Sequence, residues 1–199
     1  MQLPKPNFNG EMALEAALKN RRTIRAFKPE PISPEFLGQM LWAAYGVTEQ
    51  GGFKRSAASG GALYPLDLYA VIGDQSVNGL SKGIYHYESL PHRLVILTEK
   101  DVRQDLAKAC LGQMWMARAP VSLVITAEYS RICNKYGERG KRYAMIEAGH
   151  VGQNIFLQAE VLGLGAGIVG AFEDQKVIDI LGFPQTHEPL LIMPVGKKG

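Results

Sequence analysis

The chain has 199 residues, of which 46% are hydrophobic and 21% are charged, and its formal net charge at pH 7 is +3. These values are typical of one globular domain and argue against intrinsic disorder and against a nucleic-acid-binding protein, which would carry a basic stripe. Two cysteines without a C-x-x-C spacing argue against a disulfide framework and a structural zinc site. The start MQLPKPNFNG lacks an apolar segment, and no apolar run approaches the ~20 residues that span a bilayer, so we expect a cytoplasmic protein with no membrane partner.

Capping residues and turns mark the elements of the first half of the chain. Asn9 can cap a helix over residues 11–20, where apolar residues recur at helical spacing. Ser33 as N-cap, Pro34 in the first turn and Gly46 past the end predict a second helix between them. Further on, a strand is expected over 66–73 and a hairpin of 83–88 with 93–98 around the turn SLPH.

The second half of the chain alternates helical and strand patterns and completes one mixed α/β domain, 1–199, whose strand order the sequence does not reveal. The long helix expected near its middle has an apolar side and ends at Gly163. That side is formed by Met145, Ala148, Gly152, Ile155, Phe156, Ala159 and Leu162. The expected elements are a helix (101–111), a strand (120–127), a polar stretch (128–142), the long helix (about 143–162), a short helix (174–181) and a strand (189–196).

The segment GLGAGIVG contains a formal G-x-G-x-x-G pattern. A dinucleotide fingerprint would follow a strand and open a helix, whereas this segment follows the long helix, so we reject that interpretation. Two readings remain open: a backbone that a flat ligand can approach, or a connection that needs unusual dihedral angles.

The segment RRTIR places Arg21, Thr23 and Arg25 on one side of an extended chain. Two guanidinium groups and a hydroxyl form a good anion clamp, because planar donors match phosphate oxygens. The alternative is a solvated basic helix end. The four histidines lie far apart without metal-ligand spacing, and we expect no metal site. One of them, His150, is more typical of a core or interface residue than of a ligand.

Taken together, these segments resemble the nitroreductase family, and more closely its SagB-type dehydrogenase branch. The resemblance is carried, in the family's order, by RRTIRAF, QMLWAAYG, SGGALYPLDLY, GIYHYE, KYGERGKRYAMIEAGHVGQN, LGLGAGIVGAFED and PLLIMPVG. It implies an α+β nitroreductase-like fold, with a central, mostly antiparallel sheet flanked by helices, in an intertwined homodimer. Two FMN molecules would lie at the subunit interface, each touched by both chains.

The resemblance also implies roles for individual residues. Arg21, Thr23 and Arg25 would hold the FMN phosphate and ribityl chain, with Arg22 beside them. A glycine-containing loop of the partner subunit would approach the flavin, and a third segment would pack by the isoalloxazine ring, where backbone amides stabilise charge on the reduced flavin. The loop residues are Ser59, Gly60, Gly61 and Leu63, the ring-packing residues are Val169, Gly170 and Ala171, and Lys197 or Lys198 would complete the phosphate site.

The segment KYGER resembles the part of SagB-type enzymes that carries a catalytic Lys-Tyr pair. Lys135 and Tyr136 are therefore candidates to remove a proton while flavin N5 accepts hydride. Two positions depart from the family pattern: Ala58 replaces a frequent proline, and Ala171 replaces a frequent glycine.

The leading hypothesis is an FMN-dependent oxidoreductase, a SagB-like dehydrogenase acting on a small-molecule or peptide-derived substrate. One alternative is a reductase of nitro or quinone compounds that takes its electrons from NAD(P)H. Another is a non-catalytic flavin-binding module of a larger complex.

Overall fold

A six-stranded sheet forms the centre of the fold in the computed structural model, which describes residues 1–49 and 51–199. Its order is β3-β2-β1-β4-β6-β5, and every neighbouring pair is antiparallel, which confirms the expected sheet type. The strands are β1 (Leu66–Ile72), β2 (Gly83–Glu88), β3 (Arg93–Thr98), β4 (Val121–Glu128), β5 (Leu164–Ala166) and β6 (His187–Lys197).

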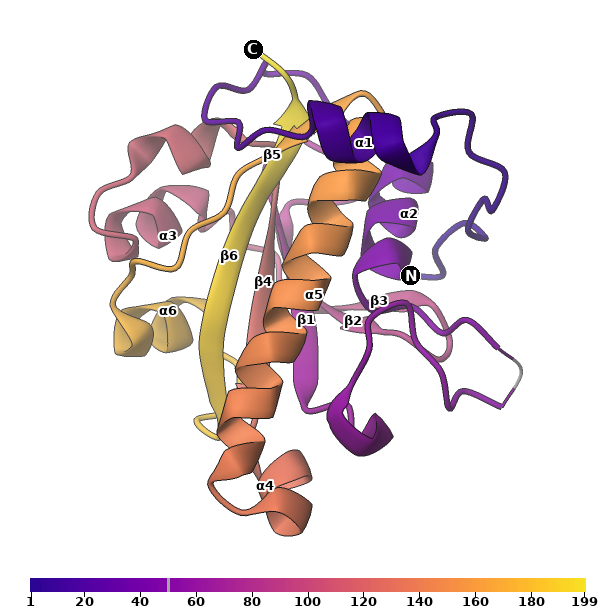
Figure 1. Cartoon of the computed structure of the whole chain (residues 1–199). Helices are drawn as coiled ribbons and strands as arrows, with labels where there is room; N and C mark the ends of the chain where they lie inside the picture. The colour runs from indigo at the N-terminus through magenta and orange to yellow at the C-terminus, as the bar shows by residue number, and fades with distance from the viewer. Residues whose placement is uncertain (50) are drawn as a thin grey trace.

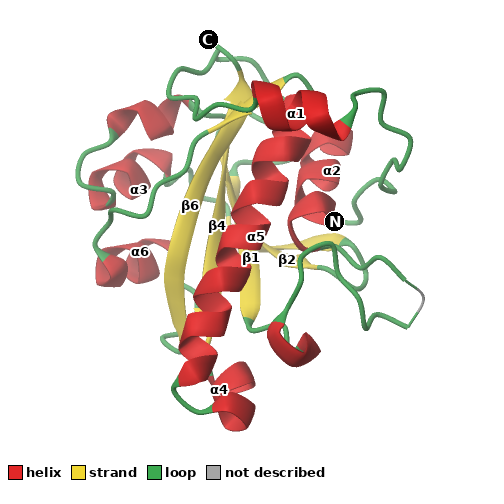
Figure 2. Ribbon diagram, in the orientation of Figure 1, coloured by secondary structure: helices red, strands yellow, loops and turns green. Residues whose placement is uncertain are grey.

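Helices cover both faces of this sheet, with α2 and α5 on one face and α3 and α6 on the other (Figure 1). The longest helix, α5, crosses the sheet diagonally, with α4 at one end and α1 at the other (Figure 2). The α-helices are α1 (Leu14–Asn20), α2 (Pro34–Tyr45), α3 (Arg103–Ala109), α4 (Ser130–Tyr136), α5 (Arg139–Val161) and α6 (Asp174–Leu181), and the short 3-10 turns are η1 (Gly60–Ala62) and η2 (Met114–Arg118).

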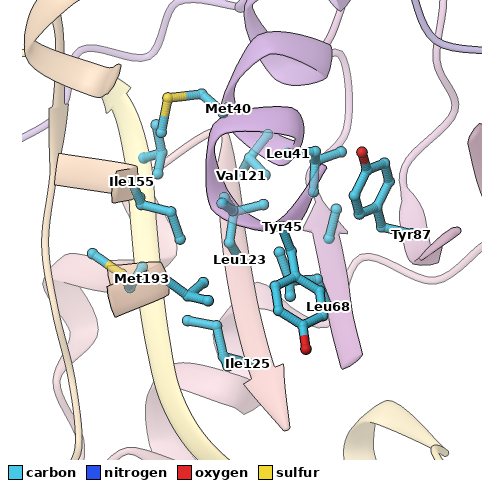
Figure 3. Packing of buried hydrophobic residues seen from close by; sticks show 14 of the residues in the cluster. Met40, Leu41, Tyr45, Leu68, Tyr87, Val121, Leu123, Ile125, Ile155 and Met193 are labelled. Atoms are coloured by element: carbon cyan, nitrogen blue, oxygen red, sulfur yellow. The ribbon is translucent and has the colours of Figure 1, made fainter. Parts of the chain in front are cut away.

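The core follows from the alternation of side chains along the strands. Leu68 of β1 packs on the α2–α5 face, while its neighbour Tyr69 faces the α3–α6 layer. Figure 3 shows Met40 of α2 and Ile155 of α5 among the apolar side chains that cover the central strands. The central strands are therefore buried on both faces, which explains the nearly continuous apolar character of β1 and β4.

The capping signals predicted one N-terminal helix well and the other poorly. Helix α2 begins after Ser33, whose hydroxyl accepts the Phe36 N–H at 3.3 Å, and it ends at Gly46, as expected. The cap assigned to Asn9 is wrong, because its N–H donates to the Asn7 side chain and α1 begins only at Leu14. Local hydrogen bonding by asparagine competes with helix formation, which explains the delayed start.

Four further differences lie in the second half of the chain. The polar stretch contains a helix, α4, and α5 begins at Arg139 rather than near Tyr143. Met145 was expected on the buried side of the long helix, but its side chain is 54% exposed. The glycine-rich segment after α5 includes a short strand, β5, that pairs with the end of β6. Within the described part of the chain, no helix combines the length and apolar character needed to cross a membrane.

Candidate functional site

Residues 55–65, which we call the glycine loop, have an unusual backbone conformation. Gly61, Ala62 and Tyr64 all have positive φ angles, of 63°, 54° and 49°. Only glycine adopts this region freely, and each of the other two residues costs about 1–2 kcal/mol there. Strained conformations of this kind concentrate at functional sites, where the surrounding structure holds them in place.

Aromatic stacking and hydrogen bonds hold the loop in this strained shape. The Arg55 guanidinium lies between two tyrosine rings, 4.3 Å from the centroid of Tyr45 and 4.4 Å from that of Tyr64. The Tyr64 N–H donates to the Ser59 hydroxyl oxygen at 2.9 Å, and the Tyr64 hydroxyl donates to the Phe53 carbonyl at 2.6 Å. Both ends of the strained segment are therefore fixed.

Two side chains of helix α5 form hydrogen bonds with the backbone of the same loop. Asn154 Nδ2 donates to the Ser56 carbonyl and His150 Nδ1 donates to the Ala58 carbonyl, each at 3.2 Å. Residues four apart lie on one side of a helix, so these two contacts form a single line of attachment. His150 is exposed and binds the loop backbone, so it is not a core residue.

The predicted catalytic pair lies against this loop. A Cβ atom on Gly61 would lie 2.6 Å from the Tyr136 hydroxyl oxygen and 3.3 Å from Lys135 Nζ. Lys135 Nζ is 5.3 Å from the centroid of the Tyr136 ring, and that ring packs edge-on against Tyr143. The structure thus brings the Lys-Tyr pair together with the glycine loop of the same chain, although the sequence had suggested a loop rather than helix α4 for the pair.

The predicted anion clamp lies at the other end of α5. Thr23 forms a parallel bridge to Ala166 of β5, which makes the RRTIR backbone an extension of the sheet. The Arg21 guanidinium lies 5.1 Å from the Phe156 ring centroid, and that of Arg25 lies 5.8 Å from the Trp115 ring. Among residues 1–49 and 51–199, neither arginine forms a salt bridge, so their donors are available to an anion.

The remaining basic candidates are engaged with other groups. Arg22 Nη1 donates to the backbone carbonyls of Lys19 and Arg21, both at 2.8 Å. Lys198 Nζ lies 2.8 Å from Glu160 near the C-terminal end of α5, and Lys197 Nζ lies 2.6 Å from Glu30. Of the two lysines, Lys198 is therefore the one whose side chain contacts α5, the helix against which Arg21 packs.

Two glycines of the GLGAGIVG segment, which precede the predicted ring-packing residues, have close-packing roles. A Cβ on Gly165 would lie 2.8 Å from Ile24, and one on Gly167 would lie 2.7 Å from Trp115. These two glycines let the RRTIR segment and η2 approach β5. Gly170 differs, because it is exposed and a Cβ there would meet only Leu191, at 4.0 Å. Its backbone is open to a ligand.

Two parts of the expected site are therefore far apart within one chain. Arg21 packs near Phe156, whereas Gly60 packs near Tyr143, thirteen residues earlier on α5. At 1.5 Å per residue this is about 20 Å along the helix.

Glu147, whose carboxyl group is buried beside the glycine loop, was not among the predicted site residues. It is 1% exposed, and its Oε1 accepts a 2.6 Å hydrogen bond from the Tyr45 hydroxyl. Figure 3 places that hydroxyl at the margin of the apolar cluster. The one available signal was the helical spacing of Glu147 with His150 and Asn154, which share its side of α5.

A second polar cluster joins α4 to the sheet. Arg131 forms ion pairs with Asp67 of β1 and Glu128 of β4, each at 2.7 Å, and His86 of β2 donates to Asp67 at 3.0 Å. His187 Nε2 lies 3.8 Å from both carboxylates, so these oxygens and the imidazole have a spacing that could suit a metal ion. The Arg131 guanidinium already supplies the positive charge between them.

The ionisation of this second cluster follows from its contacts. Burial would raise the pKa of Asp67, but the hydrogen bond from His86 and the charge of Arg131 outweigh it, so its pKa lies below the usual range. Burial lowers the pKa of His187, which is therefore neutral at pH 7. Two carboxylates, an arginine and a neutral imidazole thus connect α4 with residues of four strands, β1, β2, β4 and β6.

The chain thus combines a three-layer fold, built on an antiparallel sheet, with an anion clamp and a glycine loop. The sequence model of the nitroreductase family matches residues 18–197, so the chain belongs to the nitroreductase family. This confirms the resemblance on which the fold and the site residues were predicted.

Three similar proteins illustrate the relationship. A nitroreductase homologue of Methanocaldococcus jannaschii is 42% identical over 198 residues, covering 100% of this chain and 97% of its own. The microcin B17-processing protein McbC of Escherichia coli is 26% identical over 183 residues, which are 89% of this chain and 63% of McbC. The crystal structure of a nitroreductase from Ralstonia eutropha JMP134 superposes with a TM-score of 0.86 at 26% identity, covering 100% of this chain and 89% of that one.

Proposed function

We propose that the protein is an FMN-dependent oxidoreductase of the SagB-like dehydrogenase type. The observation that carries the proposal is the close approach of Gly61 to Lys135 and Tyr136. A strained loop and two proton-transfer groups meet there, in a family that generally uses flavin. The similarity to McbC, a microcin-processing protein, supports the dehydrogenase branch and a peptide-derived substrate.

The residues at the α1 end fit the phosphate of FMN. Arg21 and Arg25 each lie by an aromatic ring and carry guanidinium donors that no carboxylate occupies in the described chain. The open backbone at Gly170 suits the flat ring, whereas the charge of Lys198 is already paired with Glu160. Bound FMN would supply a hydride acceptor at N5.

Lys135 and Tyr136 would then handle the proton of the substrate. Oxidation of a C–H bond beside a heteroatom releases one proton in addition to the hydride. The residue that accepts this proton must be an uncharged amine or a phenolate, while the other can donate a hydrogen bond to it. Lys135 is exposed and Tyr136 is half-buried, so both can reach a substrate above the glycine loop.

We also infer a homodimer. The anion clamp lies by Phe156 of α5, whereas Ser59 and Gly60 of the glycine loop lie by Tyr143 and Glu147, nearer the other end of the helix, and both groups are expected to touch one FMN. A two-fold axis that pairs α5 with its copy in antiparallel orientation would bring the clamp of one chain to the loop of the other. The outer side of α5 supports this arrangement, because Met145 and Ile146 are 54% and 49% exposed there.

Flavin uptake and a single substitution test this function. The purified protein should be yellow or take up added FMN, and a colourless protein that does not bind FMN would refute the proposal. Lys135→Ala should abolish dehydrogenase turnover while leaving NAD(P)H-driven reduction of nitro or quinone compounds largely intact. If dehydrogenase activity survives in full, Lys135 is not the proton-transfer group.

A further inference from the structure

The buried carboxyl group of Glu147 has no role in the chemistry proposed so far. Its Oε1 accepts the Tyr45 hydroxyl, whereas no hydrogen bond of ordinary geometry reaches its buried Oε2 from the described residues. An unsatisfied buried polar atom is destabilising, and in native structures it calls for a specific explanation. The fold therefore retains this group at the expense of stability.

The surroundings of Glu147 connect it to the glycine loop. It lines a cavity of about 250 Å³ whose other walls are formed by α5 and by the loop. The lining residues are Ala58, Ser59, Gly60, Tyr143, Ile146, Glu147 and His150. Three of them belong to the glycine loop, and Ser59 and Gly60 are expected to touch the flavin.

Four groups from three segments act on the carboxyl: Tyr45 of α2, Arg55 and Ser59 of the loop, and His150 of α5. Burial raises the pKa of Glu147, and the hydrogen bonding of Ser59 and Tyr45 and the charges of Arg55 and His150 offset only part of that rise. The Ser59 hydroxyl oxygen already accepts the Tyr64 N–H, so its own proton is free for the carboxyl.

We propose that Glu147 is a positioning residue that, as the neutral carboxylic acid, holds Ser59 and with it the glycine loop in the shape that receives the flavin. The acid carries a proton that it can donate into the cavity, whereas the carboxylate is a buried charge that Arg55 and His150 offset only in part. Ionisation of Glu147 therefore loosens the loop. The proposal rests on the proposed function for the identity of the ligand, but not for the network itself.

Hydrogen exchange of the loop in the flavin-free protein tests the network. We compare wild type, Glu147→Gln, Glu147→Ala and the exposed control Glu15→Gln between about pH 5 and about pH 9. Glu147→Gln, which resembles the neutral acid, should protect residues 56–64 at every pH. Wild type and Glu15→Gln should lose protection relative to Glu147→Gln as the pH rises. In Glu147→Ala the protection factors of these residues should be about tenfold lower than in Glu147→Gln at every pH. Equal behaviour of the Gln and Ala variants, or a constant ratio of wild type to Glu147→Gln, would overturn the proposal.

FMN titration of the same four proteins separates this proposal from the proposed function. Glu147→Ala should weaken FMN binding about tenfold, and Glu147→Gln should stay within about threefold of wild type at low pH and bind more tightly than wild type at high pH. If no variant binds FMN but the exchange pattern holds, the flavin function fails and the Glu147 network stands. If FMN binds but neither the affinity nor the exchange changes in the two Glu147 variants, the positioning role of Glu147 is wrong and the flavin function stands.

Discussion

Gly61 lies so close to Tyr136 that a single added methyl group would fall 2.6 Å from the tyrosine hydroxyl oxygen. Two independent constraints thus meet at one residue, since its φ of 63° also disfavours any side chain. The glycine is needed for the shape of the loop and, separately, for the position of the candidate catalytic pair.

Substitution of Gly61 by alanine can separate these two effects. Gly79 has a similar φ of 75°, but a Cβ there would meet nothing within 4 Å. Gly61→Ala and Gly79→Ala should each lose about 1–2 kcal/mol of stability in denaturant unfolding, because both add a side chain at positive φ. Only Gly61→Ala should also lower kcat, by about tenfold or more, because Tyr136 must move. Equal kcat in the two variants would show that the contact with Tyr136 is not functional.

The anion clamp predicts a difference between FMN and riboflavin, which lacks the phosphate. Arg21→Ala and Arg25→Ala should weaken FMN binding by about 10- to 100-fold and leave riboflavin binding nearly unchanged. Arg22→Ala is the matched comparison, because its Nη1 is engaged by backbone carbonyls, and its effect should be smaller. Fluorescence titration with both flavins measures the outcome. A parallel loss of affinity for FMN and riboflavin would place the phosphate elsewhere.

The success of sequence-based prediction here depended on whether the signal was local. Helix α2 could be placed because Ser33 and Gly46 act on the backbone beside them. The short strand β5 could not, because its three residues form a strand only through pairing with β6, some thirty residues later. Likewise, Met145 fits the apolar side of α5 by spacing, and only the three-dimensional packing shows that this position faces outward.

In the candidate site, too, local motifs could be predicted and contacts between distant residues could not. RRTIR, the glycine loop and the Lys-Tyr pair were each visible as motifs, but their distances apart were not. Glu147 and Arg131 were not predicted, because a lone acidic or basic residue in a polar helix is usually solvated. Their roles depend on Tyr45 and Asp67, which approach them from distant parts of the chain.

The ion pairs of Asp67 predict a pH-dependent contribution to stability. Asp67→Asn should lower the free energy of unfolding by about 1–2 kcal/mol near neutral pH, because it removes one of the two carboxylates paired with the half-buried Arg131. The folded-state pKa of Asp67 lies below its ordinary value of 3.8. Its stabilising effect is therefore present above that value and is lost as the pH falls through the lower, folded-state pKa.

Denaturant unfolding of Asp67→Asn and of a control measures this contribution. Asp105→Asn removes an exposed carboxylate paired with Lys108 and should change stability by less than about 0.5 kcal/mol. The difference in the free energy of unfolding between wild type and Asp67→Asn should decrease as the pH falls from about 4 to about 2. A difference that is independent of pH would mean that Asp67 contributes through packing rather than through its charge.

The separation of the anion clamp from the glycine loop makes the dimer testable by complementation. In the proposed assembly each FMN site takes its clamp from one chain and its loop from the other. A chain with Arg21→Ala and Arg25→Ala keeps a normal loop, and a chain with Gly61→Val keeps a normal clamp. Each variant alone should be inactive, because every site in its homodimer contains one defect.

Co-expression of these two variants should restore activity. In a mixed dimer one site receives both defects and the other receives none, so random pairing leaves about a quarter of all sites intact. Flavin content and turnover of the co-expressed, purified protein should both approach that fraction, whereas proteins mixed after separate purification should gain activity only as subunits exchange. If each chain built a complete site of its own, co-expression would restore nothing, and the inferred exchange of loops between subunits would be wrong.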